Sequence, residues 1–255
     1  MEIKNSAFNK VAKITLYFWV MKIIATTLGE MLGDFFSMTL NLGYIISLAI
    51  TVGFLLVALI IQLKVSKFHV ILYWLVIVGT TTVGTEISDL IDRTLGLGYA
   101  WGSLILFSGL LLTLFFWHKR ESGIRVYPIT QPRVEIFYWI AILFSNSLGT
   151  AFGDFLSDNM GLSYLTGAIV TAIIILIVVV LHYYTKINHI LLFWIAFIFT
   201  RPFGATFGDL LTKPLSKGGL NFGRGVAALI AAALLALVIV YSSKKESSKQ
   251  LEGAE

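Results

Sequence analysis

The sequence predicts an all-α integral membrane protein with eight transmembrane helices, arranged as four parallel two-helix repeats. Three observations lead to this prediction: the composition is strongly apolar, one residue pattern occurs four times, and each occurrence contains two apolar stretches long enough to cross a bilayer. We expect a single membrane domain over residues 1–242. The polar residues 243–255 are expected to form a disordered tail.

The composition indicates that lipid is the main solvent of this chain. Of its 255 residues, 57% are hydrophobic and 13% are charged, whereas a soluble domain carries about 25% charged residues. Such a chain cannot cover itself with a polar surface, so the lipid bilayer is its predicted partner. The net charge of +5 does not indicate nucleic acid, because the basic residues lie between the apolar stretches. With no cysteine, disulfides and thiolate metal sites are excluded.

A pattern centred on tryptophan and aspartate recurs along the chain. The tryptophans, spaced by 55, 65 and 55 residues, are Trp19, Trp74, Trp139 and Trp194. The aspartates that follow each tryptophan by 15 residues are Asp34, Asp89, Asp154 and Asp209. The glycines that precede each aspartate by five residues are Gly29, Gly84, Gly149 and Gly204. Four matched registers indicate an internal repeat.

These repeated residues give the sequence a resemblance to a known family. It resembles bacterial multi-pass membrane proteins made of four tandem repeats, each with two membrane helices and a characteristic tryptophan. The resemblance extends over roughly residues 14–242. It implies a membrane fold built from repeats. The function of that family is unassigned, so the resemblance implies no activity.

Each repeat contains two stretches close to the ~20 residues that span a ~30 Å hydrocarbon core. The repeats are expected at about 14–63, 70–117, 134–183 and 189–242. The predicted helices are 14–37, 43–63, 70–92, 98–117, 134–158, 163–183, 189–212 and 223–242. Because two helices return the chain to its starting side, all four repeats are expected to share one orientation.

The basic residues predict the orientation of the chain in the membrane. Most of them lie at the ends of the apolar stretches on the side that holds both termini. By the positive-inside rule, both termini are therefore expected in the cytoplasm. The predicted location is the bacterial inner (plasma) membrane.

The odd-numbered helices carry most of the acidic residues. At 100° per residue, the residues seven and four positions before each aspartate lie on nearly the same helix face. An acidic side chain in hydrocarbon costs several kcal/mol unless it is paired or hydrated, so this face is expected to line the interior of the bundle. The predicted ion-binding residues are Asp34, Asp89, Asp154, Asp209, Glu30, Glu86, Arg201, Thr27, Thr82 and Ser147.

The small residues on the same helices predict how the helices pack. Each odd-numbered helix has a pair of small residues four positions apart, such as Gly29 and Gly33, which lets membrane helices approach closely. The odd-numbered helices are therefore expected to form the core. Their aspartates would then surround one axis.

This arrangement predicts a membrane transporter or exporter of a small cation. Carboxylates with nearby hydroxyl groups suit Mg²⁺, Mn²⁺ or Ca²⁺, so Asp34, Asp89, Asp154 and Asp209 are candidate metal ligands. These carboxylates equally suit protons, because carboxyl groups in a cluster have different pKa values and some keep their protons near neutral pH. No motif of a nucleophile, a phosphate loop or a zinc site is evident, so we predict no enzymatic activity and no cofactor.

Two other functions stay open at this stage. The aspartates fit a non-transporting scaffold or regulatory protein if they serve only as structural hydrogen-bonding groups. A carrier of a small organic anion would use Arg201 as its anion-binding group, although pairing of Arg201 with a carboxylate is the favoured interpretation. Lys22, about 120° around its helix from Asp34, is expected to extend towards the cytoplasm. The sequence does not decide between a monomer and a dimer, nor does it give the ion, the direction or the coupling.

Overall fold

The computed structural model describes residues 9–121 and 123–252, and in these ranges all regular secondary structure is helical. The long helices in these ranges are α2 (Leu16–Asp34), α3 (Gly43–Lys64), α4 (Val70–Asp89), α5 (Gly98–Glu121), α6 (Pro132–Asp154), α7 (Tyr164–Tyr184), α8 (His189–Thr212) and α9 (Arg224–Glu252). The short ones are the π-helices η1 (Phe35–Thr39), η2 (Leu90–Thr94) and η3 (Phe155–Asn159), and the 3₁₀ helix η4 (Leu215–Lys217).

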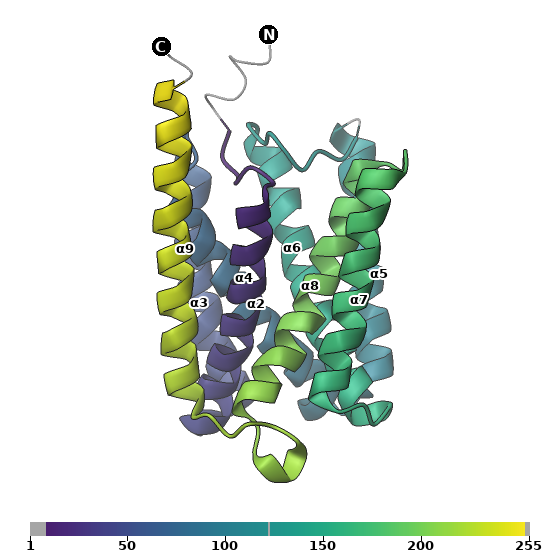
Figure 1. Cartoon of the computed structure of the whole chain (residues 1–255). Coiled ribbons are helices and arrows are strands. Elements are labelled where there is room, and N and C mark those ends of the chain that lie inside the picture. The colour runs from purple at the N-terminus through teal and green to yellow at the C-terminus, as the bar shows by residue number, and fades with distance from the viewer. Residues whose placement is uncertain (1–8, 122, 253–255) are drawn as a thin grey trace.

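Four helices form a ring at the centre of the bundle. In this core ring α2 packs against α4, α4 against α6, α6 against α8, and α8 against α2 (Figure 1). These are the first helices of the four repeats, as the sequence predicted for the core. We call the end of the bundle where α2 begins and α9 ends the inner end, and the opposite end, where α2 stops at Asp34, the outer end.

The second helix of each repeat packs on the next repeat rather than only on its own. Helix α3 packs on α4, α5 on α6 and α7 on α8, and α9 returns to pack on α2. Figure 1 shows α9 beside α2, although the two helices come from opposite ends of the chain. The last helix therefore closes the circle of repeats.

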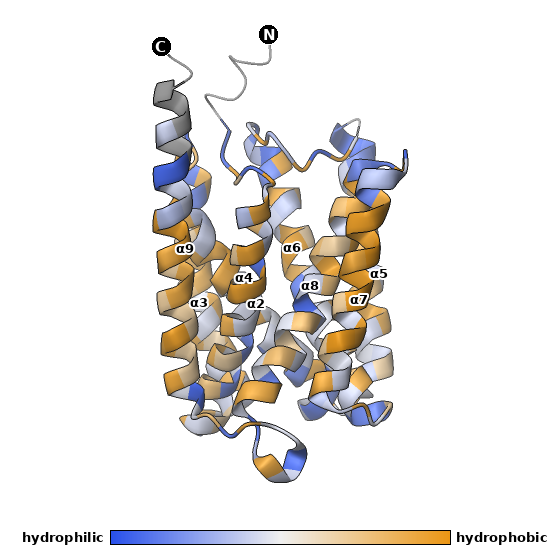
Figure 2. Ribbon diagram, viewed as in Figure 1, coloured by the Kyte–Doolittle hydropathy of each residue, from blue (hydrophilic) through white to orange (hydrophobic). Residues whose placement is uncertain are grey.

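The outside of the bundle is apolar along the length of the helices. Seven helices in the described ranges are long and apolar enough to cross a membrane. Figure 2 shows hydrophobic residues along the outer helices and hydrophilic ones near both ends of the bundle. The remaining long helix, α2, contains three charged residues, Lys22, Glu30 and Asp34, and all three are buried. Helix α2 thus differs in composition because its charges lie inside the core ring.

The repeated glycines bring the core helices close together, as predicted. A methyl group added at Gly204 would lie 2.9 Å from the backbone nitrogen of Thr27, too close for an unshifted backbone. The glycine contacts around the ring are Gly29 with Thr81, Gly84 with Asn146, Gly149 with Arg201, and Gly204 with Thr26. Each glycine therefore meets the equivalent position of the next repeat, which makes the ring regular.

The outer ends of three core helices depart from the α-helical form. Helices α2, α4 and α6 end at their repeat aspartates and continue as η1, η2 and η3. Such π-helical turns are uncommon and frequently occur at functional sites. In the fourth repeat, α8 instead continues as an α-helix to Thr212. The repeat aspartates thus lie at the outer end of the core ring.

One predicted boundary is wrong. The sequence predicted a helix over 223–242 followed by a disordered tail, whereas α9 continues to Glu252. Residues 243–252 are mainly Ser, Lys, Glu, Gln and Leu, of which most are good helix formers, and they contain no Gly or Pro. Residues 253–255 of the predicted tail lie outside the described ranges.

Candidate functional site

The interior of the core ring is built from five layers of equivalent residues, each four positions further along the core helices. From the inner end, the aromatic layer is Phe18, Tyr73, Tyr138 and Phe193, and the Lys22 layer is Lys22, Ile77, Ile142 and Phe197. The next three are the Arg201 layer (Thr26, Thr81, Asn146, Arg201), the Glu30 layer (Glu30, Thr85, Thr150, Ala205) and the aspartate layer (Asp34, Asp89, Asp154, Asp209). Every member is at most 5% exposed.

In the aspartate layer, Arg93 joins the second and third repeats. Its Nε lies 3.1 Å from a carboxylate oxygen of Asp89, and its NH2 lies 3.1 Å from Asp154 and 4.0 Å from Asp158. Nε also donates a hydrogen bond to the hydroxyl of Tyr99 at 3.1 Å. One guanidinium group therefore neutralises carboxylates from two neighbouring core helices.

Lys213 makes the matching connection between the fourth and first repeats. Its Nζ lies 2.8 Å from a carboxylate oxygen of Asp34 and 3.1 Å from Asp209. Arg224 adds a second cation to Asp34, at 3.2 Å. Burial lowers the pKa of Lys213, but the carboxylates of Asp209 and Asp34 outweigh burial and raise it above its ordinary value. Lys213 therefore stays charged at any pH near neutrality.

The two ion-pair clusters belong to one electrostatic site. Asp89 and Asp154 of the Arg93 cluster occupy the same buried layer as Asp34 and Asp209 of the Lys213 cluster. The four repeat aspartates thus lie in one layer at the outer end of the core ring, and each carries a basic partner.

One layer further in, Arg201 is paired as the favoured interpretation expected. Its NH2 donates to a carboxylate oxygen of Glu30 at 2.8 Å and also contacts the hydroxyl of Thr85. The Thr85 hydroxyl in turn donates to Glu30 at 3.3 Å. Arg201 is completely buried, so it is not available to an anion from solvent in this arrangement.

Lys22 lies inside the ring, and its expected extension towards the cytoplasm is wrong. The amine donates to Oδ1 of Asn146 at 2.8 Å and lies 3.9 Å from the ring centroid of Phe197. An ammonium group over an aromatic face is attracted by the ring electrons. Residues four positions apart along a helix form a ridge that is inclined to the helix axis. When the helix is tilted, this ridge can run parallel to the axis of the ring, so that all of its residues face the interior. The 120° offset therefore did not exclude Lys22 from the interior.

The remaining predicted site residues do not reach the aspartate layer. Glu86 is buried between α3 and α4, where it accepts hydrogen bonds from Ser47 and Thr51, and its assignment to the central site is wrong. Thr82 donates to the carbonyl of Val78 at 3.0 Å, and Ser147 to that of Leu143 at 3.0 Å. The hydroxyl oxygen of Thr27 is buried with no hydrogen-bond partner.

The predicted set of metal ligands does not form a metal site. Among the residues that the structure describes, no group of three or more His, Asp or Glu side chains converges as metal binding requires. The carboxylates bind Arg93, Lys213 and Arg224 instead. These cations were not predicted as site residues, although Arg93 and Lys213 each follow an aspartate by four positions, the spacing that brings side chains together on a helix.

A cavity lined by α3, α4 and α6 lies away from these charges. Its volume is about 360 Å³. The lining residues are Leu55, Leu59, Leu63, Thr80, Ile136, Trp139, Ile140 and Leu143. Because this cavity is almost wholly apolar, it does not suit an ion, and the aspartate layer stays the candidate site.

The fold and the site together define a helical-repeat membrane protein with ion pairs buried inside its ring of core helices. A family model described as Repeat of Unknown Function (DUF347) matches four segments, residues 17–68, 72–122, 137–188 and 192–248. The chain belongs to this family. The four matched segments coincide with the four repeats derived from the sequence. No curated protein and no solved structure matches the chain.

Proposed function

We propose that this protein crosses the membrane eight times and transports a small cation through the aspartate layer. Helix α2 is the eighth span, because its three charged residues face the ring interior rather than lipid. The contacts of Gly29 with Thr81 and of Gly204 with Thr26 join equivalent positions of successive repeats. This regularity supports one shared orientation of the four repeats.

The distribution of charge supports an inner end that faces the cytoplasm. Exposed basic residues at that end include Lys64, Lys67, Lys119, Arg120 and Arg133. Basic residues beside membrane spans favour the cytoplasmic side. The protein would then lie in a bacterial inner membrane, with both ends of the described chain on the cytoplasmic side.

One observation carries the transport proposal: all four repeat carboxylates are buried, and each is paired with a basic side chain near the outer end. The side chains of Arg93 and Arg224 are 30% and 24% exposed. These two side chains can therefore move towards water. Because the carboxylates that they leave behind are buried, binding of another cation in their place is then favoured. Arg93, Lys213 and Arg224 thus act as tethered counter-ions that a transported cation or protons displace.

The deeper layers favour a carrier over an open pore. The side chains in every layer of the ring are buried, and one of them, Arg201, is a buried cation. A cation moving inwards must pass Arg201, whose charge is balanced by Glu30. Passage therefore requires rearrangement of the Glu30–Arg201 pair, as in a gated carrier.

Flux measurements in liposomes test the proposal. We expect Asp34→Asn and Asp154→Asn, in folded protein, to reduce flux of the transported cation by about tenfold or more, because each removes one of the buried carboxylates that would hold this cation. The assay should compare protons, Na⁺, K⁺, Mg²⁺ and Mn²⁺. Glu86→Gln is the matched control, since Glu86 is a buried carboxyl outside the ring, and it should conduct like the unaltered protein.

Wild-type flux in all four Asp→Asn variants would exclude transport through this layer. The second candidate is a non-transporting scaffold, and one observation favours it: Arg93 and Lys213 each join two repeats, so the ion pairs also hold the ring together. A scaffold predicts that the Asn variants melt at lower temperature and that the unaltered protein gives no cation flux.

A further inference from the structure

The chain segment before α2 lies inside the protein, outside the four matched repeats. Asn9, Lys10, Val11 and Ala12 are all buried, with Val11 completely so. Figure 1 shows this segment crossing the inner end of the bundle near the start of α6. We call residues 9–12 the inner segment. The equivalent residues 64–67, 129–132 and 184–187 do not form a continuously buried stretch, so the inner segment breaks the symmetry of the ring.

Backbone hydrogen bonds fix the inner segment to two loops. The N–H of Lys10 donates to the carbonyl of Ile129 at 2.9 Å, and the N–H of Phe68 donates to the carbonyl of Asn9 at 2.8 Å. The side-chain oxygen of Asn9 accepts from the N–H of Ile129 at 3.0 Å. The segment is thereby attached both to the loop between α3 and α4 and to the loop between α5 and α6.

A buried ion pair completes this attachment. Lys10 pairs with Glu135 at the start of α6, and their side chains are 5% and 0% exposed. The Lys10 amine also donates to the carbonyl of Leu63 at 2.9 Å. Gln62 donates to both the Lys10 carbonyl and Glu135, each at 3.0 Å. Two helices from different repeats thus hold one lysine of the inner segment.

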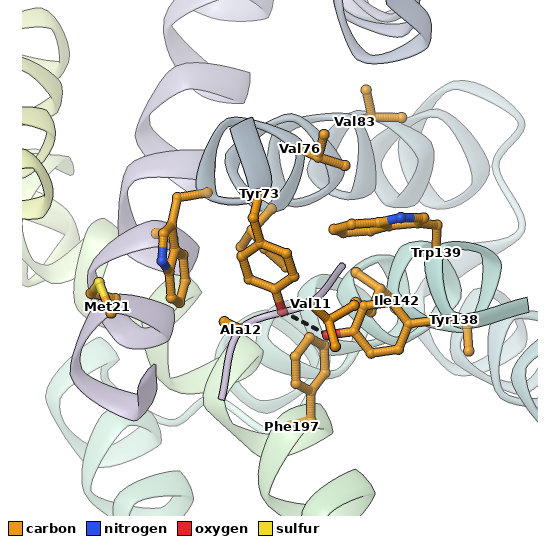
Figure 3. Packing of buried hydrophobic residues seen from close by; sticks show 14 of the residues in the cluster. Val11, Ala12, Met21, Tyr73, Val76, Val83, Tyr138, Trp139, Ile142 and Phe197 are labelled. Carbon is orange, nitrogen blue, oxygen red and sulfur yellow. Dashed lines mark hydrogen bonds between the residues drawn. The ribbon is translucent and has the colours of Figure 1, made fainter. Parts of the chain in front are cut away.

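The inner segment lies against the aromatic layer. In that layer the hydroxyls of Tyr73 and Tyr138 are hydrogen-bonded at 2.6 Å. Figure 3 shows Val11 and Ala12 beside this tyrosine pair, and all four residues belong to one buried hydrophobic cluster. The ring is therefore closed twice at its inner end, by the aromatic side chains and by the segment that covers them.

The two ends of the ring are closed to different degrees. At the outer end, the side chains of Arg93 and Arg224 that cover the aspartates are partly in contact with water. At the inner end, the covering residues are buried, and the attachments of Lys10 must break before water can enter. The ring therefore opens more readily at its outer end than at its inner end.

We propose that the inner segment is the inner gate of this protein and that the Lys10–Glu135 pair is its latch. The inference rests on the proposed transport function, since a gate matters only if the ring conducts a substrate. Opening requires Lys10 to leave Glu135 and Leu63 together, after which the aromatic layer faces the inner side. The aspartate layer comes from the repeats alone, whereas the inner segment controls access to the ring from the inner end.

The absence of cysteine from the sequence allows a direct test. A single Tyr138→Cys reporter lies under the inner segment, and a membrane-impermeant methanethiosulfonate reagent is added from the inner side of sealed vesicles. We expect slow modification when the latch is intact. Lys10→Met should increase the rate at least about tenfold, because breaking a buried ion pair raises the population of the open form. Lys245→Met is the matched control, since Lys245 bonds Tyr17 at an exposed position near the same end.

Two further variants guard against misfolding. Val134→Cys is a second reporter, buried at the start of α6. Asn9→Ala removes the bond to Ile129 without leaving a buried charge, and it should also accelerate modification. Folding of each variant is checked by size-exclusion chromatography.

The rate of thiol modification tests the gate independently of transport, because modification of the thiol needs no substrate. Unchanged rates in folded Lys10→Met and Asn9→Ala proteins would overturn the gate, even if the aspartate variants lose flux. Acceleration by both variants, with Lys245→Met unchanged, would support the gate. Acceleration without flux of any cation would support the opening and contradict the proposed function.

Discussion

Gly204→Val is expected to keep the core ring from closing. Any side chain at Gly204 would meet Thr26 and would lie 2.9 Å from the backbone nitrogen of Thr27. The contact is with backbone as well as side chain, so rotamer changes cannot relieve it and α8 must move away from α2. Overpacking of this kind costs about 1–3 kcal/mol or more, and here it separates the two helices whose junction closes the ring. The measurement is the melting temperature of the purified protein in detergent.

Gly53→Val is the matched control for this prediction. Gly53 is also a glycine within a helix, α3, but a methyl group there would have no neighbour within 4 Å. We expect its melting temperature to stay close to that of the unaltered protein. Equal melting temperatures for Gly204→Val and Gly53→Val would mean that the close approach of α8 and α2 does not hold the ring.

Arg201→Met is expected to destabilise the protein by about 3–5 kcal/mol, because it leaves the Glu30 carboxylate buried without its cation. The pair has an N–O distance of 2.8 Å, and both side chains are almost fully buried. Removal of Glu30 by Glu30→Gln should be similarly harmful, since it leaves Arg201 unpaired. The change in unfolding free energy can be followed by titration with a denaturing detergent.

The double variant Glu30→Gln with Arg201→Met distinguishes the pair from its individual members. It contains no uncompensated charge at this position, and replacing both members of a buried pair is often nearly neutral. We therefore expect it to be more stable than either single variant. If the effects of the two single changes simply add in the double variant, the contact between Glu30 and Arg201 contributes nothing specific.

The sequence was sufficient to predict the helices and the core, but not how the repeats interlock. Apolar length located the spans, and the recurring glycines marked the faces of close approach. The packing of α3 on α4, and of α9 on α2, could not be predicted, because periodicity shows which face of a helix is buried and not which helix covers it. Residues 243–252 are polar and were therefore predicted to be disordered, but most of them are good helix formers and they continue α9.

The candidate site was likewise predicted only in part from the sequence. The repeat made the four aspartates visible, whereas Arg93 and Lys213 were interpreted only as signals of topology. Glu86 was predicted as a site residue because it is one of the acidic residues of the repeated segments, yet its side chain faces Ser47 and Thr51. The Lys10–Glu135 pair joins residues separated by 125 positions, a distance over which a single sequence carries no pairing information.

The closure of the fourth repeat onto the first has a consequence for biosynthesis. Glu30 and Asp34 are made early, but their partners Arg201, Lys213 and Arg224 follow 171, 179 and 190 residues later. During translation α2 must therefore keep two unneutralised carboxylates until α8 and the start of α9 have been made. Helix α2 is thus made before the other three core helices, but it acquires its ion-pair partners only after all of them are complete.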